Sequence, residues 1–200
     1  MNLKKFYLEE TVEVGTDEAG RGCLAGPVVA AAVILPNDFD HPLLNDSKKL
    51  NKKQRAILRP IIEEKSLAYG VAFISEEKID EINILQASIL AMHRSIEKLS
   101  ITPEHIIVDG NKFNPYKNIP YTTVVKGDAK FMSIAAASIL AKTYRDEFMD
   151  GIDAEFPNYC WSKNKGYPTK KHRNAIREFG ATVYHRKTFK LLPEQLKFNL

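Results

Sequence analysis

Short apolar runs that alternate with longer segments of helical period constrain the fold of this 200-residue chain most strongly. Two strand-like runs come first, at residues 11–16 and 28–35, and only a glycine-rich turn joins them. No helix fits between these runs, so they are expected to form an antiparallel hairpin. Later strands alternate with helices. The pattern therefore predicts an α/β fold built on a mixed sheet.

The later segments have a readable type as well. The long helix after Ser75 carries apolar residues at helical spacing as far as Leu99. Thr169 is a suitable N-cap for a last helix, and Gly180 is a suitable residue to follow its end. The other predicted elements are a helix at 51–65, strands at 67–74, 105–108 and 121–125, and helices at 131–148 and 169–179.

Charge is unevenly distributed along the chain. The formal net charge is +4, but residues 156–200 carry ten Lys or Arg residues and two acidic ones. Such a basic segment favours an anionic partner, and nucleic acid is one candidate. We expect one main domain over residues 1–157 and a basic, mostly helical extension over residues 158–200 that helps to bind a duplex.

The cysteines and the apolar runs bear on location. Cys23 and Cys160 are isolated, so they form neither a disulfide framework nor a zinc site, which fits a reducing cytoplasm. The first ten residues lack the apolar core of a signal peptide, and the run at 28–35 is far too short to span a bilayer. We expect a cytoplasmic monomer with no membrane association.

Acidic residues fall at the predicted ends of strands. Asp17 and Glu18 end the first strand, Asp109 follows an apolar run, and Asp128 lies just beyond the last strand. If these strands are neighbours the carboxylates converge, and a divalent cation is the usual relief for their repulsion. Hard oxygen ligands favour Mg²⁺ or Mn²⁺. Two such ions beside a phosphate can activate water and stabilise the leaving oxygen.

The adjacency of Asp17 and Glu18 sets a condition on this site. Strict alternation would direct the two side chains to opposite faces of the sheet, so the strand must break there for both to reach one site. Gly20 and Gly22, directly after them, make such a break plausible. Any one of these acids alone is more simply a surface or turn residue. Their joint placement is what favours a metal site.

The turn at residues 20–25 matches the loose glycine pattern of dinucleotide-binding proteins. That pattern requires a helix to begin at the turn, whereas here Gly26-Pro27 and a strand-like run follow. A nicotinamide or flavin site is therefore disfavoured. Exposed backbone N–H groups and Arg21 instead suit the phosphate and sugar of one nucleotide.

Six short motifs follow one another along the chain. They are DEAGRG at 17–22, NDSKKL at 45–50, VDGN at 108–111, KGD at 126–128 with AAASILAK at 135–142, KGYPT at 165–169 and HR at 185–186. In their order and spacing they resemble the ribonuclease HII family, from residue 15 to about residue 189. The sequence departs from the family at Cys23, where proline is frequent, at Thr143-Tyr144 and at Thr188, and none of these touches a carboxylate.

The resemblance implies a ribonuclease H-like mixed sheet flanked by helices, with the catalytic domain at 1–157 and a C-terminal helical extension. It implies a metal-dependent endonuclease that cleaves RNA in RNA–DNA hybrids. Such an enzyme nicks duplex DNA on the 5′ side of an embedded ribonucleotide and leaves 3′-hydroxyl and 5′-phosphate ends. The family serves the removal of misincorporated ribonucleotides and other RNA from DNA.

The resemblance also implies roles for individual residues. The catalytic residues, which would bind two Mg²⁺ or Mn²⁺ ions, are Asp17, Glu18, Asp109 and Asp128. Gly20, Arg21 and Gly22 would read the 2′-hydroxyl, and Tyr167 would lie beside the sugar at the RNA–DNA junction. Ser47 and Lys48 would also contact the substrate, with Lys48 at its phosphates.

Two other classes of function remain open. Another nuclease with a ribonuclease H fold, such as a junction resolvase or an integrase core, would use the same acids, but it has no need for Arg21 and Tyr167 as sugar readers. A binding module without catalysis has no use for four convergent carboxylates, which repel phosphate unless metal intervenes. Cleavage of all-DNA substrates would favour the first alternative, and binding without turnover would favour the second.

Four more side chains allow two interpretations. Asp146 either supports the site or pairs with Arg145 or Lys142 at helical spacing. His172 and His185 are either acid–base catalysts or solvent-exposed or phosphate-adjacent residues, and the second is expected because the sequence shows no paired arrangement. Trp161 fits base stacking and a place in the core about equally well.

Overall fold

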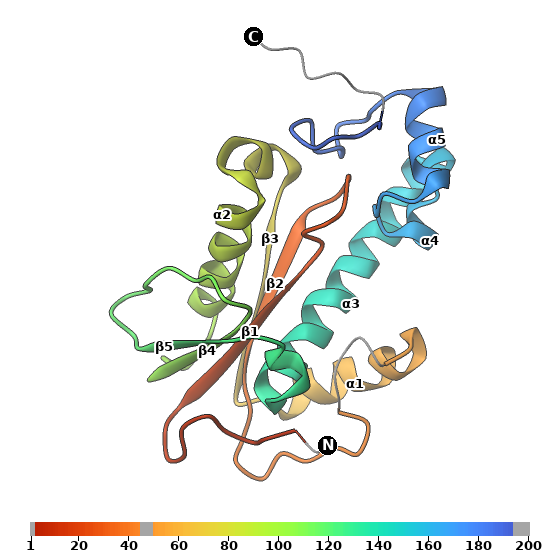
Figure 1. The fold of residues 1–200 in the computed structure, drawn as a ribbon. Helices are drawn as coiled ribbons and strands as arrows, with labels where there is room; N and C mark the ends of the chain where they lie inside the picture. Colours follow the sequence, from red (N-terminus) through yellow and green to blue (C-terminus); the bar gives the residue numbers. More distant parts are fainter. Residues whose placement is uncertain (1–2, 45–49, 194–200) are drawn as a thin grey trace.

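The computed structural model describes residues 3–44 and 50–193. A five-stranded sheet with the order β3-β2-β1-β4-β5 forms its centre (Figure 1). The first three strands form an antiparallel meander, whereas β4 is parallel to β1 and β5 is parallel to β4. The predicted mixed α/β sheet is thus confirmed. The strands are β1 (Glu13–Ala19), β2 (Val28–Ile34), β3 (Ala68–Ile74), β4 (His105–Asp109) and β5 (Tyr121–Val124).

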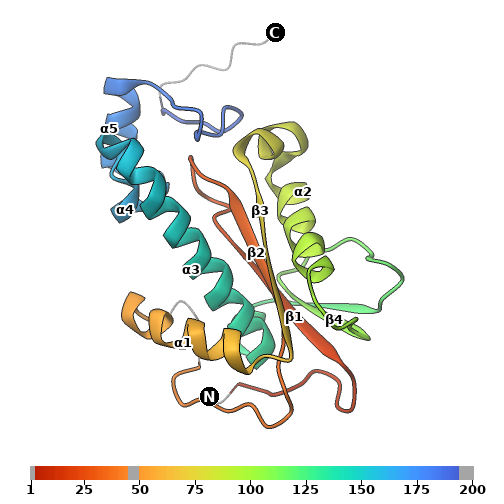
Figure 2. The ribbon, with the colours of Figure 1, turned by 180° about the vertical axis from the view of Figure 1, so that it is seen from behind.

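Helices cover both faces of this sheet. The helix α2 lies on one face, and α1 and α3 lie on the other (Figures 1 and 2). Every residue of β2 is buried, because both of its faces are covered. Ala30 and Ala32 pack with the α2 cluster, while Ala31 and Val33 pack with the α3 cluster. The helices are α1 (Lys52–Lys65), α2 (Glu76–Glu97), α3 (Met132–Glu155), α4 (Trp161–Asn164) and α5 (Lys170–Phe179).

The long helix α3 lies unusually close to the middle of the sheet. Its alanines at positions 135–137 are fully buried. On β1, a Cβ atom added to Gly15 would come within 2.4 Å of the Ile134 backbone nitrogen. Small residues on both elements therefore allow backbone to approach backbone. This approach brings Ser138 of α3 next to Asp17 of β1.

The C-terminal part of the chain covers the turn between β1 and β2 (Figure 1). Trp161 and Ile176 from this part share a buried cluster with Leu24 of the turn and Met149 of α3. The backbone of Leu24 also donates to the Gly166 carbonyl at 2.8 Å. The division at residues 157/158 stays a prediction. None of the helices in the described ranges is sufficiently long and apolar to cross a membrane.

Candidate functional site

The first pair of acids lies near the end of β1, as expected, but the strand does not break there. The ladder of β1 with β2 continues through Asp17↔Ala31 and Glu18↔Ala30 to Ala19. The fully buried strand β2 holds β1 in register, so no break occurs between the two acids. The parallel ladder with β4 ends earlier, at Thr16↔Val108. The two acids therefore lie where the sheet opens between β1 and β4.

The other two acids approach from the neighbouring strands. Asp109 is the last residue of β4 and accepts a hydrogen bond from the Gly127 backbone N–H at 2.6 Å. Asp128 follows Gly127 in a single 3₁₀ turn between β5 and α3 and is 1% exposed. A Cβ atom at position 127 would come within 2.6 Å of the Ile134 side chain, so glycine allows this close packing. Asp128 therefore directly follows Gly127, the residue whose backbone N–H binds Asp109.

The electrostatics of the cluster show how closely the acids are held. Burial, followed by the charges of Glu18 and Asp109, raises the pKa of Asp17 well above its usual value, although a Ser138 hydrogen bond opposes this. Burial also raises the pKa of Glu18, while the guanidinium of Arg21 lowers it. Arg21 donates to Glu18 Oε1 at 3.0 Å. A bound cation would offset both the burial and the mutual repulsion of these carboxylates.

The donor set fits a hard divalent cation. Glu18 Oε2 is buried and has no hydrogen-bond partner, so no protein donor competes with a cation for this oxygen. All four candidate ligands are carboxylates, which favour Mg²⁺ and Mn²⁺. Among residues 3–44 and 50–193, no three His, Cys, Asp or Glu side chains form a ready-made metal cage. An open cluster of this kind suits ions that keep several waters and take further ligands from substrate phosphates.

The glycine turn after Glu18 is fixed by a buried arginine from the far end of the chain. Arg186 is 0% exposed and donates to the carbonyls of Gly20 at 2.7 Å, Arg21 at 2.9 Å and Gly26 at 2.8 and 3.0 Å. Burial lowers the pKa of Arg186, and backbone carbonyls take up its donors. Gly20 itself has a φ of +97°, which only glycine adopts readily. The turn is therefore a rigid element.

A second buried arginine fixes the other side of the same turn. Arg145 of α3 donates to the carbonyls of Pro27 at 2.9 Å, Ala25 at 3.0 Å and Lys165 at 2.8 Å. A Cβ atom at Gly20 would lie 2.1 Å from Arg145 Nε, so glycine is required there for space as well as for φ. From the sequence, Arg145 was only a possible partner of Asp146, and Arg186 was part of a motif without a role of its own. Only their contacts reveal that both hold the turn.

Tyr167 lies at the surface beside this turn. Its side chain is 43% exposed, and its ring would lie 3.9 Å from a Cβ atom at Gly22. Its hydroxyl interacts with the Cys23 thiol, and burial raises the pKa of Tyr167. The ring of Tyr167 therefore lies beside the turn at residues 20–22, and the reading of a sugar there stays a prediction.

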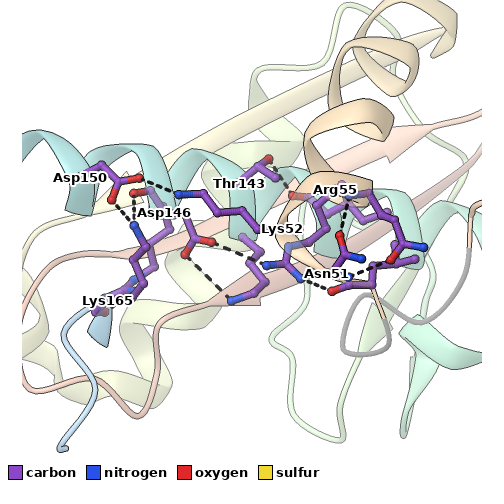
Figure 3. Close-up of polar contacts among 12 residues, drawn as sticks. Asn51, Lys52, Arg55, Thr143, Asp146, Asp150 and Lys165 are labelled. Carbon is purple, nitrogen blue, oxygen red and sulfur yellow. Dashed lines mark hydrogen bonds and ion pairs between the residues drawn. The ribbon is translucent and has the colours of Figure 1, made fainter. Parts of the chain in front are cut away.

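Ion pairs join α1 to α3. Figure 3 shows Asp146 and Asp150 of α3 facing Lys52 and Arg55 of α1. Asp146 lies 3.9 Å from Arg55 and 4.0 Å from Lys142, while Asp150 binds Lys52 at 3.4 Å and also pairs with Lys165. The predicted pairing of Asp146 with Lys142 is observed, and Arg55 is a partner that the sequence did not indicate. Ser47 and Lys48, predicted to bind the substrate, lie outside the described residues.

The structure decides between the two interpretations of Trp161 and corrects the expectation for two histidines of the C-terminal part. Trp161 is 0% exposed and belongs to the core, which excludes stacking on bases in this conformation. His172 and His185 were expected near solvent or phosphate, but they are 0% and 1% exposed and contact each other. The expectation was wrong because their pairing joins two segments 13 residues apart, which no local pattern reveals.

Comparison with known proteins agrees with this fold. A family model described as ribonuclease HII matches residues 14–192. Ribonuclease HII of Christiangramia forsetii is 63% identical over 197 residues, which cover 98% of this chain and 100% of that protein. A structure described as the PCNA:RNase HII complex from Archaeoglobus fulgidus superposes with a TM-score of 0.76 at 26% identity, covering 92% of this chain and 98% of the other. Bst-RNase HIII in complex with Mn²⁺ superposes with a TM-score of 0.74 at 20% identity, covering 92% and 69%, a likeness of fold alone.

Proposed function

The chain belongs to the ribonuclease HII family and is a metal-dependent ribonuclease H that acts on RNA in RNA–DNA hybrids. From this we propose that it also nicks duplex DNA on the 5′ side of an embedded ribonucleotide. One observation carries the proposal: the acid cluster on β1 continues directly into the rigid turn at residues 20–22, beside Tyr167. A phosphate at the acids thus has its adjacent sugar at the turn. Such an enzyme serves the removal of ribonucleotides from DNA during replication and repair.

The acids supply the metal-binding half of this site. Asp17, Glu18, Asp109 and Asp128 would hold two Mg²⁺ or Mn²⁺ ions, and the buried, unpartnered Glu18 Oε2 supports this assignment. The ions, when bound, supply activation of water and stabilisation of the leaving oxygen. Ser138 keeps Asp17 oriented through a side-chain hydrogen bond. Arg21 neutralises part of the charge of Glu18 from the solvent side.

The turn and the tyrosine supply the selective half. The 2′-hydroxyl is the group that separates RNA from DNA at a given position. A rigid backbone turn with Arg21 can present donors and acceptors to that hydroxyl, and the ring of Tyr167 can pack against the sugar. Cys23 and Cys160 are both free thiols, which supports a reducing compartment such as the cytoplasm. We propose a monomer as the active form.

We expect a DNA duplex that contains one ribonucleotide to be nicked once, on the 5′ side of that ribonucleotide, and only with a divalent metal. Water and not the 2′-hydroxyl is the nucleophile, so the products carry a 3′-hydroxyl and a 5′-phosphate. End-labelled duplexes resolved beside chemical ladders measure both the position and the chemistry of the ends.

The matched control is the same duplex with deoxyribose at every position, which should stay intact. Equal cleavage of this control would indicate a nuclease of the resolvase or integrase type. A 2′,3′-cyclic end, or full activity in EDTA, would contradict the mechanism. Binding of the duplex without any turnover would indicate a binding module.

We expect Tyr167→Phe and Tyr167→Ala to reduce turnover in a graded way, with the alanine variant slower. Phenylalanine removes only the hydroxyl, whereas alanine also removes a ring contact worth about 1–3 kcal/mol at aromatic nucleic-acid sites. Duplex binding should change less, because phosphate contacts elsewhere remain. Single-turnover cleavage and melting temperatures test both variants.

Phe179→Ala is the control for this pair, since Phe179 is a similarly exposed aromatic residue, at 49%, on α5. It should leave turnover at the level of the parent. If Tyr167→Ala also cleaves at the parent rate, or loses its fold, Tyr167 has a structural role and no part in reading the sugar.

A further inference from the structure

Two buried histidines lie in direct contact behind Tyr167. The Nε2 atoms of His172 and His185 are 3.2 Å apart, and neither residue is more than 1% exposed. His172 belongs to α5, whereas His185 lies in the segment that follows it. Two basic rings in a buried contact need defined proton positions, because two adjacent positive charges would be strongly disfavoured there.

The partners of His172 fix its tautomer. Its Nδ1 lies 2.9 Å from the Tyr167 carbonyl oxygen, which can only accept a hydrogen bond. Nδ1 therefore carries a proton and donates it. The Nε2 atom accepts from the indole N–H of Trp161 at 3.0 Å, so this atom is unprotonated. His172 is thus neutral, with its single proton directed at Tyr167.

The tautomer of His185 follows from that of His172. Because His172 Nε2 is an acceptor, His185 Nε2 must donate across the 3.2 Å contact. Its other nitrogen, Nδ1, then accepts from the Thr182 backbone N–H at 2.9 Å and the Thr182 hydroxyl at 3.0 Å. The Trp161 N–H and the His185 N–H share the one lone pair of His172 Nε2, so each ring carries one proton and both rings are neutral. Burial lowers the pKa of both histidines, that of His185 to about 4, which agrees with this pattern.

The same segment is joined to the glycine turn. His185 forms an antiparallel bridge with Ala25, and the Arg186 backbone donates to the Leu24 carbonyl at 2.9 Å. The Arg186 side chain then binds the carbonyls of Gly20 and Arg21. The turn is therefore bonded to the segment at residues 185–186, and the ring of His185 in that segment contacts His172, which in turn is bonded to Tyr167.

We propose that His172 and His185 form a neutral hydrogen-bond relay that positions Tyr167 relative to the turn at residues 20–22. His172 is a positioning residue in this arrangement, since it touches the backbone of Tyr167 and not the substrate. The relay sets the distance between the two elements that face the ribose. The inference rests on the proposed role of Tyr167 in reading the sugar.

The test compares His172→Leu, which removes the donor to Tyr167, with His172→Asn, whose amide nitrogen can replace Nδ1. We expect the leucine variant to cleave the single-ribonucleotide duplex about tenfold more slowly under single-turnover conditions, the equivalent of one hydrogen bond. Its affinity for the duplex should stay close to that of the parent. The asparagine variant should recover most of the rate.

His93→Leu is the matched control. His93 lies on α2, is half-buried, and contacts the Asn114 carbonyl at 3.0 Å, so it is also a histidine bonded to a backbone carbonyl. It should keep the parent rate. The proposal would be overturned if His172→Leu cleaved at the parent rate. It would also be overturned if His172→Asn cleaved as slowly as His172→Leu while keeping the melting temperature of the parent.

A double-mutant cycle separates positioning from a general loss of structure. If His172 acts through Tyr167, His172→Leu should slow the parent but add little to Tyr167→Ala. Equal effects in both backgrounds would overturn the relay as a positioning device. If Tyr167→Ala alone cleaves at the parent rate, the proposed reading of the sugar fails, and the histidine pair then has no sugar-reading residue to position.

Nitrogen NMR of the two rings tests the relay without any cleavage, and so stands even if the proposed activity fails. At about pH 6, where an exposed histidine is mostly protonated, both rings should be neutral. His172 should carry its proton on Nδ1, and His185 should carry its proton on Nε2. A doubly protonated ring, or the opposite tautomer at either residue, would overturn the assignment. The measurement needs only the folded parent protein, so it remains decisive if a variant does not fold.

Discussion

The Asp17→Asn variant should lose turnover by on the order of a thousandfold or more. Loss of a residue that only hydrogen-bonds a metal ligand already costs about 10–100-fold in activity, and Asp17 is itself a proposed ligand. An amide keeps the shape of the side chain and can still accept from the Glu18 backbone N–H, which donates to Asp17 Oδ1 at 2.7 Å. It does not supply an anionic ligand. Single-turnover cleavage of the single-ribonucleotide duplex measures the loss.

The same substitution should leave the metal-free protein as stable as the parent or make it more stable. The folded-state pKa of Asp17 is raised above its unfolded value, so the folded protein binds the proton more tightly. The free energy of unfolding therefore falls as the pH rises from about 4 through the raised pKa. Above that pKa the charged Asp17 carboxylate destabilises the folded protein in full. Asparagine carries no charge and avoids this cost.

Melting in EDTA and in Mn²⁺ checks both parts of this prediction. The parent should gain stability on addition of Mn²⁺, and Asp17→Asn should gain less, because an ion that binds only the folded state stabilises it. Asp38→Asn, a change at an exposed acid outside the cluster, is the control and should behave like the parent. A lower melting temperature of Asp17→Asn in EDTA would make Asp17 a structural partner of Ser138.

The Arg186→Met variant should lower the free energy of unfolding by about 3–5 kcal/mol, since hydrogen bonds to a charged group contribute about 1.5–3 kcal/mol each and are not fully additive. Methionine fills much of the volume but supplies no donor to the carbonyls of Gly20, Arg21 and Gly26. Turnover should fall with stability, because the turn then loses its fixed position beside Glu18.

Arg186→Lys provides a graded comparison. Lysine keeps the charge but lacks the planar set of donors that reaches three carbonyls, so we expect an intermediate loss. Arg177→Met on α5 is the control, since Arg177 is exposed and should change stability little. Urea unfolding of the three variants gives the free energies. An Arg186→Met protein with the unfolding midpoint of the parent would show that the turn is held by other contacts.

The local sequence determined the type and order of nearly all elements. β2 has apolar residues at every position, and this pattern alone predicts a strand covered on both faces. Asn51 and Gln54 form a capping box at the start of α1, and Thr169 caps α5 through the His172 backbone N–H. Gly180 follows the end of α5 as expected. These signals need only neighbouring residues, so they can be read from one sequence.

The sequence also identified the four acids that the structure brings close to one another. Asp17, Glu18 and Asp109 influence one another electrostatically, and Asp128 follows the residue that binds Asp109. Their roles as ligands stay a proposal. The expected strand break was wrong, because the register of β1 depends on its partner β2 and not on the glycines that follow.

Only the tertiary structure decided how the selective half of the site is held. Arg186 and Gly20 are separated by 166 positions, and His172 and His185 belong to different segments, so no periodicity or capping pattern connects them. A buried arginine and a buried histidine look like surface residues in a sequence, because both are usually exposed or only partly buried. Their burial becomes favourable only where backbone carbonyls and a second ring supply every hydrogen bond, and that condition exists only in the folded chain.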